Sequence, residues 1–151
     1  MIEVAVATSA DDELVTGLNA LLPQLSASAE PLTRESVAAI VGSPATTLYI
    51  AREDGHVVGT LTLCVFAIPT GVRAWIEDVV VGEGARGRGV GEALTRRALE
   101  DARALGARTV DLTSRPSREA ANSLYRRVGF EVRHTNVYRF FLEGDLPSES
   151  A

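Results

Sequence analysis

A short segment rich in glycine and arginine contains the residues with the clearest chemical potential. Five of them follow closely on one another: Arg86, Gly87, Arg88, Gly89 and Gly91. The segment comes after a β-branched run that ends at Val81, and apolar residues then recur every three or four positions, as in a helix. The first N–H groups of a helix lack partners and carry the positive end of its dipole, and glycines let backbone amides approach an anion. Because guanidinium groups also bind phosphate oxygens, the segment predicts a polyphosphate site.

Three known phosphate-binding loops compete for this segment. A P-loop of the type GxxxxGK[ST] is excluded because no Gly-Lys pair occurs in the chain. A dinucleotide fingerprint, GxGxxG, occurs at 82–87, but only some sixty residues follow it, too few for a doubly wound sheet. The third pattern, Arg-x-x-Gly-x-Gly, is met by Arg86, Gly89 and Gly91 and resembles the acetyl-CoA pyrophosphate loop of the GNAT N-acetyltransferases. A glycine turn without a ligand is the alternative that the short motif leaves open.

Hydrophobic periodicity and turn residues predict the elements that must position this loop. Strands are expected at 2–6, 46–51, 57–66, 72–81, 109–113, 130–133 and 136–142. Four helices are expected. The first follows Ser9, which with Asp12 resembles a capping box, and the second runs from Thr33 to about Val41. The third runs from the glycine loop to Gly106, and the fourth runs from Ser117 to Arg127 and is followed by Gly129. The Asp54-Gly55 pair predicts a hairpin turn.

This order of elements resembles the GNAT family over nearly the whole chain. The resemblance implies an α/β GNAT fold, with a mixed, mostly antiparallel sheet and flanking helices. Its central parallel strands, 72–81 and 109–113, would splay apart and receive the pantetheine arm of acetyl-CoA between them. Ligands commonly bind at such carboxyl ends of parallel strands. One domain is expected over 1–146, with a flexible tail at 147–151.

The resemblance also implies which groups contact the cofactor in addition to the loop. Near the end of the central strand, the resemblance implies contacts from Val79, Val80 and Val81. A bulge there would free the N–H of Val79 to bind the oxyanion. At the start of the following helix it is Val90. The alternative is that 79–81 are only part of an uninterrupted apolar strand. Both interpretations can hold, because the cofactor would use only backbone atoms of these residues.

A later segment, Asn122 to Phe130, matches the family pattern Asn-x-x-Tyr…Gly-Phe. Asn122 and Tyr125 lie three residues apart and so share a helix face. The resemblance assigns Asn122 to cofactor binding and implies that the Tyr125 hydroxyl lies near the cofactor sulfur. A phenol with a pKa of about 10 can protonate a thiolate whose conjugate acid lies near 8–9. The alternative role for Tyr125 is packing.

Two adjacent carboxylates are candidates for the general base. Alternation with period two places four residues on one face of the strand: Trp75, Glu77, Val79 and Val81. Asp78 then lies on the other face. Because family members commonly carry a substrate-side carboxylate at the position of Glu77, we expect it to be the base or an ammonium anchor. The alternative is that Glu77 is only a charge at the edge of the sheet. The run 76–78 also resembles the corresponding segment of glucosamine-6-phosphate N-acetyltransferases.

Composition narrows the class of protein. A net charge of −5 over 151 residues argues against nucleic-acid binding, and no apolar run approaches the ~20 residues of a membrane-spanning helix. The single cysteine, Cys64, cannot form an internal disulfide, which with no visible leader at Met1 favours the cytoplasm. No cluster has metal-ligand spacing, so no metal is expected.

We therefore expect a cytoplasmic N-acetyltransferase that uses acetyl-CoA and acetylates a small-molecule or peptide amine by direct attack in a ternary complex. No base is evident beside Cys64, so a route through an acetyl-cysteine is disfavoured. The alternative is a catalytically inactive GNAT-fold sensor or interaction module that binds CoA. The resemblance also allows a homodimer, since family members often pair through late strands or helices.

Overall fold

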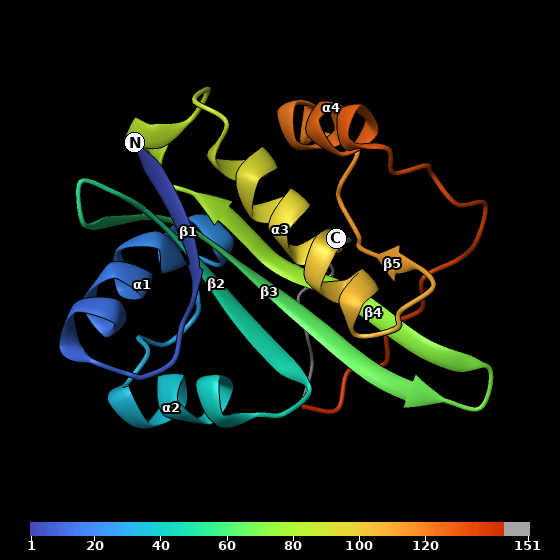
Figure 1. The fold of residues 1–151 in the computed structure, drawn as a ribbon, viewed down its shortest axis with the longest axis horizontal. Coiled ribbons are helices and arrows are strands. Elements are labelled where there is room, and N and C mark those ends of the chain that lie inside the picture. Colours follow the sequence, from blue (N-terminus) through green and yellow to red (C-terminus); the bar gives the residue numbers. More distant parts are fainter. Residues whose placement is uncertain (144–151) are drawn as a thin grey trace. The chain divides into compact units, whose positions relative to one another are not determined.

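The computed structural model describes residues 1–143 (Figure 1). Their helices and strands are β1 (Ile2–Val6), α1 (Asp12–Leu25), α2 (Arg34–Gly42), β2 (Thr46–Glu53), β3 (His56–Ile68), β4 (Gly71–Val81), the short 3₁₀ turn η1 (Glu83–Ala85), α3 (Val90–Ala104), β5 (Val110–Asp111) and α4 (Glu119–Val128). The chain divides into two compact units. Met1–Thr113 contains the sheet and the first three α-helices, and the part from Ser114 onward contains α4. The tail expected at 147–151 lies outside the described residues.

The first unit is built on a five-stranded mixed sheet with strand order β1-β2-β3-β4-β5. The first four strands pair antiparallel, and β5 pairs parallel with β4. The hairpin between β2 and β3 turns at Asp54 and Gly55, both with positive φ, as the Asp-Gly pair predicts. The expected mixed, mostly antiparallel sheet is therefore confirmed, with its parallel pair, β4 and β5, at one edge of the described sheet.

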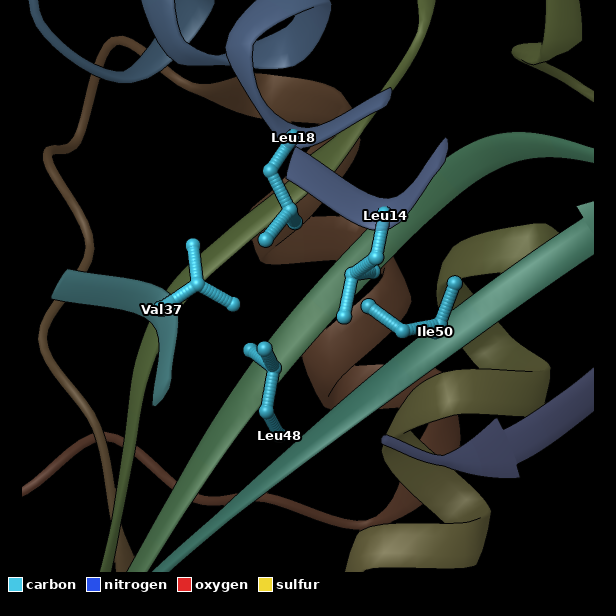
Figure 2. Close-up of a cluster of buried hydrophobic side chains, with 5 residues drawn as sticks. All are labelled: Leu14, Leu18, Val37, Leu48 and Ile50. Carbon is cyan, nitrogen blue, oxygen red and sulfur yellow. The ribbon is translucent and has the colours of Figure 1, made fainter. Parts of the chain in front are cut away.

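Different helices cover the two faces of this sheet. On one face, α1, α2 and β2 contribute a buried cluster (Figure 2) of Leu14, Leu18, Val37, Leu48 and Ile50. Tyr49, between two cluster residues on β2, points to the opposite face because side chains alternate along a strand. There its hydroxyl donates a hydrogen bond of 2.7 Å to Asp101 of α3. The sheet thus lies between α1 and α2 on one side and α3 on the other.

Helix ends follow the expected signals in part. Thr33 and Ser36 form a reciprocal capping box at α2, and Gly106 and Gly129 adopt positive φ just beyond α3 and α4. The cap predicted at Ser9 is wrong, because Asp11 accepts the N–H of Leu14 at 2.9 Å and begins α1 instead.

The cap predicted at Ser117 is also wrong. Arg118 precedes α4, and no side chain caps that helix. Ser117 contributes its backbone carbonyl, which accepts the N–H of Glu119. Its position in the chain is thus one residue too early for its hydroxyl to cap the helix.

The strand pair predicted at 130–133 and 136–142 is absent, since the described residues after α4 have no regular secondary structure. Several large apolar side chains of this segment are exposed: Val132, Val137, Tyr138, Phe140 and Leu142. Apolar and β-branched composition favours a strand only where a neighbouring strand supplies backbone partners. No ladder partner pairs with these residues, so the pattern is not realised as a strand.

Candidate functional site

β4 contains a β-bulge near its carboxyl end. Between Glu77 and Val80, two residues of β4, Asp78 and Val79, stand opposite Leu61 of β3 alone. Asp78 has a φ of 49°, in the left-handed region that Asp and Asn tolerate better than most side chains. A bulge leaves one residue outside the regular ladder and re-aims its backbone. The structure therefore has a bulge where the sequence resemblance placed one.

The extra residue changes which face of the sheet the side chains at the end of β4 occupy. Glu77 pairs with Thr62, which pairs with Leu48 of the buried cluster, so Glu77 lies on the face of α1 and α2. Val81 pairs with Gly59, where an added Cβ would meet side chains of α3 at 3.0 and 3.2 Å. The prediction that Val81 shares a face with Glu77 is therefore wrong, because the bulge shifts the alternation by one residue.

The other edge of β4 is mostly unpaired. β5 pairs with it only at Ala74 and Trp75, and β5 itself ends at Asp111. Within the described chain, residues 76–81 have no partner from β5, so their backbone groups on this edge are not used by the sheet. Because unpaired N–H and C=O groups form a template for another extended chain, this edge can bind an extended ligand that carries amides.

The glycine loop after β4 ends at the N-terminus of α3 (Figure 1). Gly87 and Gly89 have φ of 79° and 82°, and a Cβ at either residue would meet no atom within 4 Å. Gly89 precedes α3 without any side-chain cap. The loop thus combines open space, a left-handed backbone and an uncapped helix N-terminus, and this combination suits a phosphate group.

Both loop arginines contact other parts of the first unit. Arg86 donates to the side chain of Gln24 in α1 at 2.8 Å and, more weakly, to the carbonyl of Val81 at 3.4 Å. Arg88 donates to Glu53 at the end of β2 at 2.5 Å and to the carbonyl of Gly84 at 2.9 Å. The arginines are held in place before any anion arrives.

Sequence reasoning missed the two side chains that hold these arginines, Gln24 and Glu53. They lie 62 and 35 residues away from their partners, and neither belongs to a motif. The ion pair of Arg88 with Glu53 is partly exposed, and such pairs contribute about 0–1 kcal/mol. A phosphate can therefore compete for the Arg88 guanidinium at small cost.

The candidate base lies beside the bulge. The side chains of Glu77 and Asp78 are exposed, and neither forms an ion pair or hydrogen bond within the described part of the chain. A carboxylate without a cationic partner, on the face opposite α3, is available to an ammonium group or a water molecule. Cys64, two strand positions away along this face, is a half-buried free thiol.

The second unit contains the candidate acid. Tyr125 on α4 is buried, and its ring packs edge-on against Phe130 with centroids 5.7 Å apart. Burial raises the pKa of the Tyr125 phenol, while the positive charge of Arg118 lowers it in part. The phenol is thus a neutral donor at physiological pH. Asn122 donates from its side-chain amide to the carbonyl of Arg115 at 2.9 Å.

Further features of the described residues bear on ligand binding. The hydroxyl of Ser114, three residues after β5, is buried without a hydrogen-bond partner in residues 1–143, which suits a polar ligand group. The same residues hold no group of three or more side chains that could bind a metal ion. They also contain no helix that is long and apolar enough to span a membrane.

Comparisons with known proteins agree on one family. The sequence model of the acetyltransferase (GNAT) family matches residues 16–130. N-alpha-acetyltransferase 30 of Schizosaccharomyces pombe is 29% identical over 98 residues, which cover 64% of each protein. Glucosamine 6-phosphate N-acetyltransferase 1 of Oryza sativa subsp. japonica is 32% identical and covers 85% of this chain and 82% of its own. A putative acetyltransferase from Agrobacterium tumefaciens matches 92% of the chain with a TM-score of 0.81, at 29% identity and 99% coverage of its own chain. The match covers 64% of the Schizosaccharomyces pombe protein, so this chain spans less than two thirds of the length of that relative.

We expect CoA or acetyl-CoA to raise the melting temperature of the wild-type protein and Gly89→Asp to abolish this stabilisation. The new carboxylate would fill the space before α3 and repel a pyrophosphate, whereas ligand binding to the folded state raises the melting temperature by mass action. Melting temperatures with and without CoA measure this effect.

The control is Gly106→Asp at the opposite end of α3, where φ is 90° and no atom lies within 4 Å of an added Cβ. Both variants carry similar backbone strain, so both should melt earlier without ligand, and only Gly106→Asp should still respond to CoA. A Gly89→Asp protein that CoA stabilises as strongly as the wild type would show that the loop assignment is wrong.

Proposed function

Because the chain belongs to the acetyltransferase (GNAT) family, we propose that it transfers an acetyl group from acetyl-CoA to a primary amine by direct attack in a ternary complex. One observation carries the proposal. The bulged end of β4, whose edge toward β5 is unpaired, is followed by the loop 82–89 and then by the uncapped N-terminus of α3, so this stretch of backbone offers both an anion site and free strand amides.

The residues proposed to hold the cofactor follow from this arrangement. The first amides of α3, from Val90 and Gly91, and those of Gly87 and Gly89 would donate to the pyrophosphate, and Arg86 and Arg88 would add positive charge. When bound, acetyl-CoA supplies an activated thioester. The backbone of Val81 would pair with the amides of the pantetheine arm along the free edge of β4, and Val80 is proposed to contact the cofactor beside it.

At the bulge, the N–H of Val79 would donate a hydrogen bond to the acetyl oxygen and so stabilise the negative charge that develops there. A donor positioned in advance at such an oxygen is typically worth about 3–4 kcal/mol of the barrier. Asp78 has a left-handed backbone, and neither Asp78 nor Val79 has a register partner in β3, which supports a freed amide at Val79. A donor at Val79 would account for the left-handed backbone of Asp78.

Two side chains are proposed to move protons. Glu77, exposed and unpaired beside the bulge, takes the proton of the substrate ammonium directly or through water, or holds that ammonium until it loses the proton. Tyr125 gives its phenol proton to the departing thiolate. Its role rests on the family motif that begins at Asn122, and its burial keeps the phenol protonated for this step. Asn122 is proposed to contact the cofactor.

The relatives support an amine as the acceptor. The names of the two curated relatives describe N-alpha-acetylation and N-acetylation of glucosamine 6-phosphate, respectively. Both acceptors are primary amines, although they differ in size and charge. The second candidate function is a protein that binds CoA without transferring its acetyl group, and the presence of Glu77 and Tyr125 favours the enzyme.

Acetyl-CoA should release its thiol in the presence of this protein only when an amine is added. A thiol reagent measures the release, with amino acids, amino sugars, polyamines and short peptides as acceptors. Tyr125→Phe should lower kcat by roughly ten- to a thousandfold with little change in CoA affinity, the scale of general acid catalysis. The matched control, Tyr138→Phe, removes an exposed hydroxyl from the same unit and should act as wild type. CoA binding without thiol release for any amine would support the sensor and contradict the enzyme.

Glu77→Gln should lose rate most at neutral pH and recover in part as the pH approaches the pKa of the amine. Near that pH the solution supplies neutral amine, so a base is needed less. If Glu77 only anchors the ammonium, the loss should instead appear as a higher KM that high pH does not restore. A pH–rate profile for each variant separates the two roles.

Asp78→Asn is the matched control, because Asn also tolerates a left-handed backbone and one charge is removed at the neighbouring position. It should keep the pH profile of the wild type. A Glu77→Gln profile identical to that of the wild type would remove Glu77 from the mechanism.

A further inference from the structure

The face of the sheet that carries Glu77 is covered only in part. Near the end of β4, Thr60 and Val80 pair on this face and are buried. Here α1 lies close, since an added Cβ at the adjacent Gly82 would meet Leu21 at 3.4 Å. The cover by α1 therefore extends to the strand positions on one side of Glu77.

On the other side of Glu77 the same face is open. Three cross-strand pairs follow one another along β3 and β4: Thr62 with Glu77, Cys64 with Trp75, and Phe66 with Arg73. We call these six residues the β3–β4 strip. Each is half-buried or exposed, whereas the residues between them that face α3, such as Leu63 and Ile76, are buried. The helices α1 and α2 thus leave the strip uncovered.

The strip has a definite chemical order. The Glu77 carboxylate at one end has no cationic partner within the described residues. At the other end the charge of Arg73 is met by Asp111 at 3.2 Å, and its guanidinium lies 5.9 Å from the centre of the Trp75 ring. This cation–π contact holds the indole in place. One anionic group is followed by a fixed aromatic ring and then by Phe66, which is 40% exposed.

On the basis of the proposed function, we propose that the β3–β4 strip binds the acceptor and selects primary amines that carry an aromatic or bulky apolar group. The ammonium would lie at Glu77, and the apolar group would lie against Trp75. Alternate residues of a strand are about 7 Å apart, so one small amine can place its ammonium at Glu77 and its ring against Trp75. Trp75 is then a specificity-determining residue.

Two features favour a small cationic ligand with an apolar body over other occupants of the strip. The unpaired charge is negative, so it complements an ammonium group. The strip also begins beside the bulge where the acetyl group is proposed to react, so an amine held at Glu77 is next to the acceptor side of the reaction. A strongly polar amine would leave Trp75 and Phe66 in contact with water and gain nothing from them.

The test compares 2-phenylethylamine with ethanolamine, two primary amines of similar basicity, in the wild type and in variants of Trp75. The wild type should favour 2-phenylethylamine in kcat/KM by roughly ten- to a hundredfold, the range that an apolar contact gives. Trp75→Ala should bring this ratio close to one, mainly through a higher KM for 2-phenylethylamine. Trp75→Phe should restore most of the preference. Leu105→Ala, which removes an exposed apolar side chain beyond α3, is the control and should keep the wild-type ratio.

Failure of this inference is separate from failure of the proposed function. Thiol release with any amine supports the proposed function, whichever amine is preferred. A wild type that uses other amines but neither probe, or that uses both probes equally, would overturn the selection by the strip. So would a Trp75→Ala protein whose ratio equals that of the wild type, or a Trp75→Phe protein that behaves like Trp75→Ala.

Discussion

Between Glu77 and Val80, β4 carries one residue more than β3, and the arrangement of the candidate site depends on this mismatch. The extra residue forces Asp78 into a left-handed conformation and frees the backbone of Val79 from the regular ladder. It also turns Val81 toward α3 while Glu77 stays on the opposite face. The same bulge therefore places Val81, on the side of α3, and the exposed carboxylate of Glu77 on opposite faces of the sheet.

Small residues allow the loop and α3 to approach the sheet. Gly59 of β3 lies so close to α3 that a Cβ would meet its side chains at 3.0 Å. Gly87 and Gly89 then let the chain enter α3 with a backbone that other residues rarely adopt. Gln24 and Glu53, from α1 and β2, hold the two loop arginines. The site thus draws on backbone geometry more than on a cluster of catalytic side chains.

Much of the fold could be predicted from the sequence because local signals decide it. The Asp54-Gly55 turn, the Thr33 cap and the glycine entry to α3 are properties of neighbouring residues. Features set by distant partners were missed. Alternation placed Val81 on the wrong face because a bulge leaves no mark in the period of apolar residues. The strands predicted at 130–133 and 136–142 failed because strand formation needs a paired edge, which composition does not supply.

The central claim is that CoA lies along the free edge of β4 with its pyrophosphate at the N-terminus of α3. Backbone amide shifts in a ¹⁵N NMR titration with CoA test this claim directly, because each amide reports on its own surroundings. The largest changes should occur at Val79 and Val81 in β4 and at Gly87, Gly89 and Gly91 before and within α3. Binding that shifts amides elsewhere in the chain and leaves these five unchanged would contradict the account.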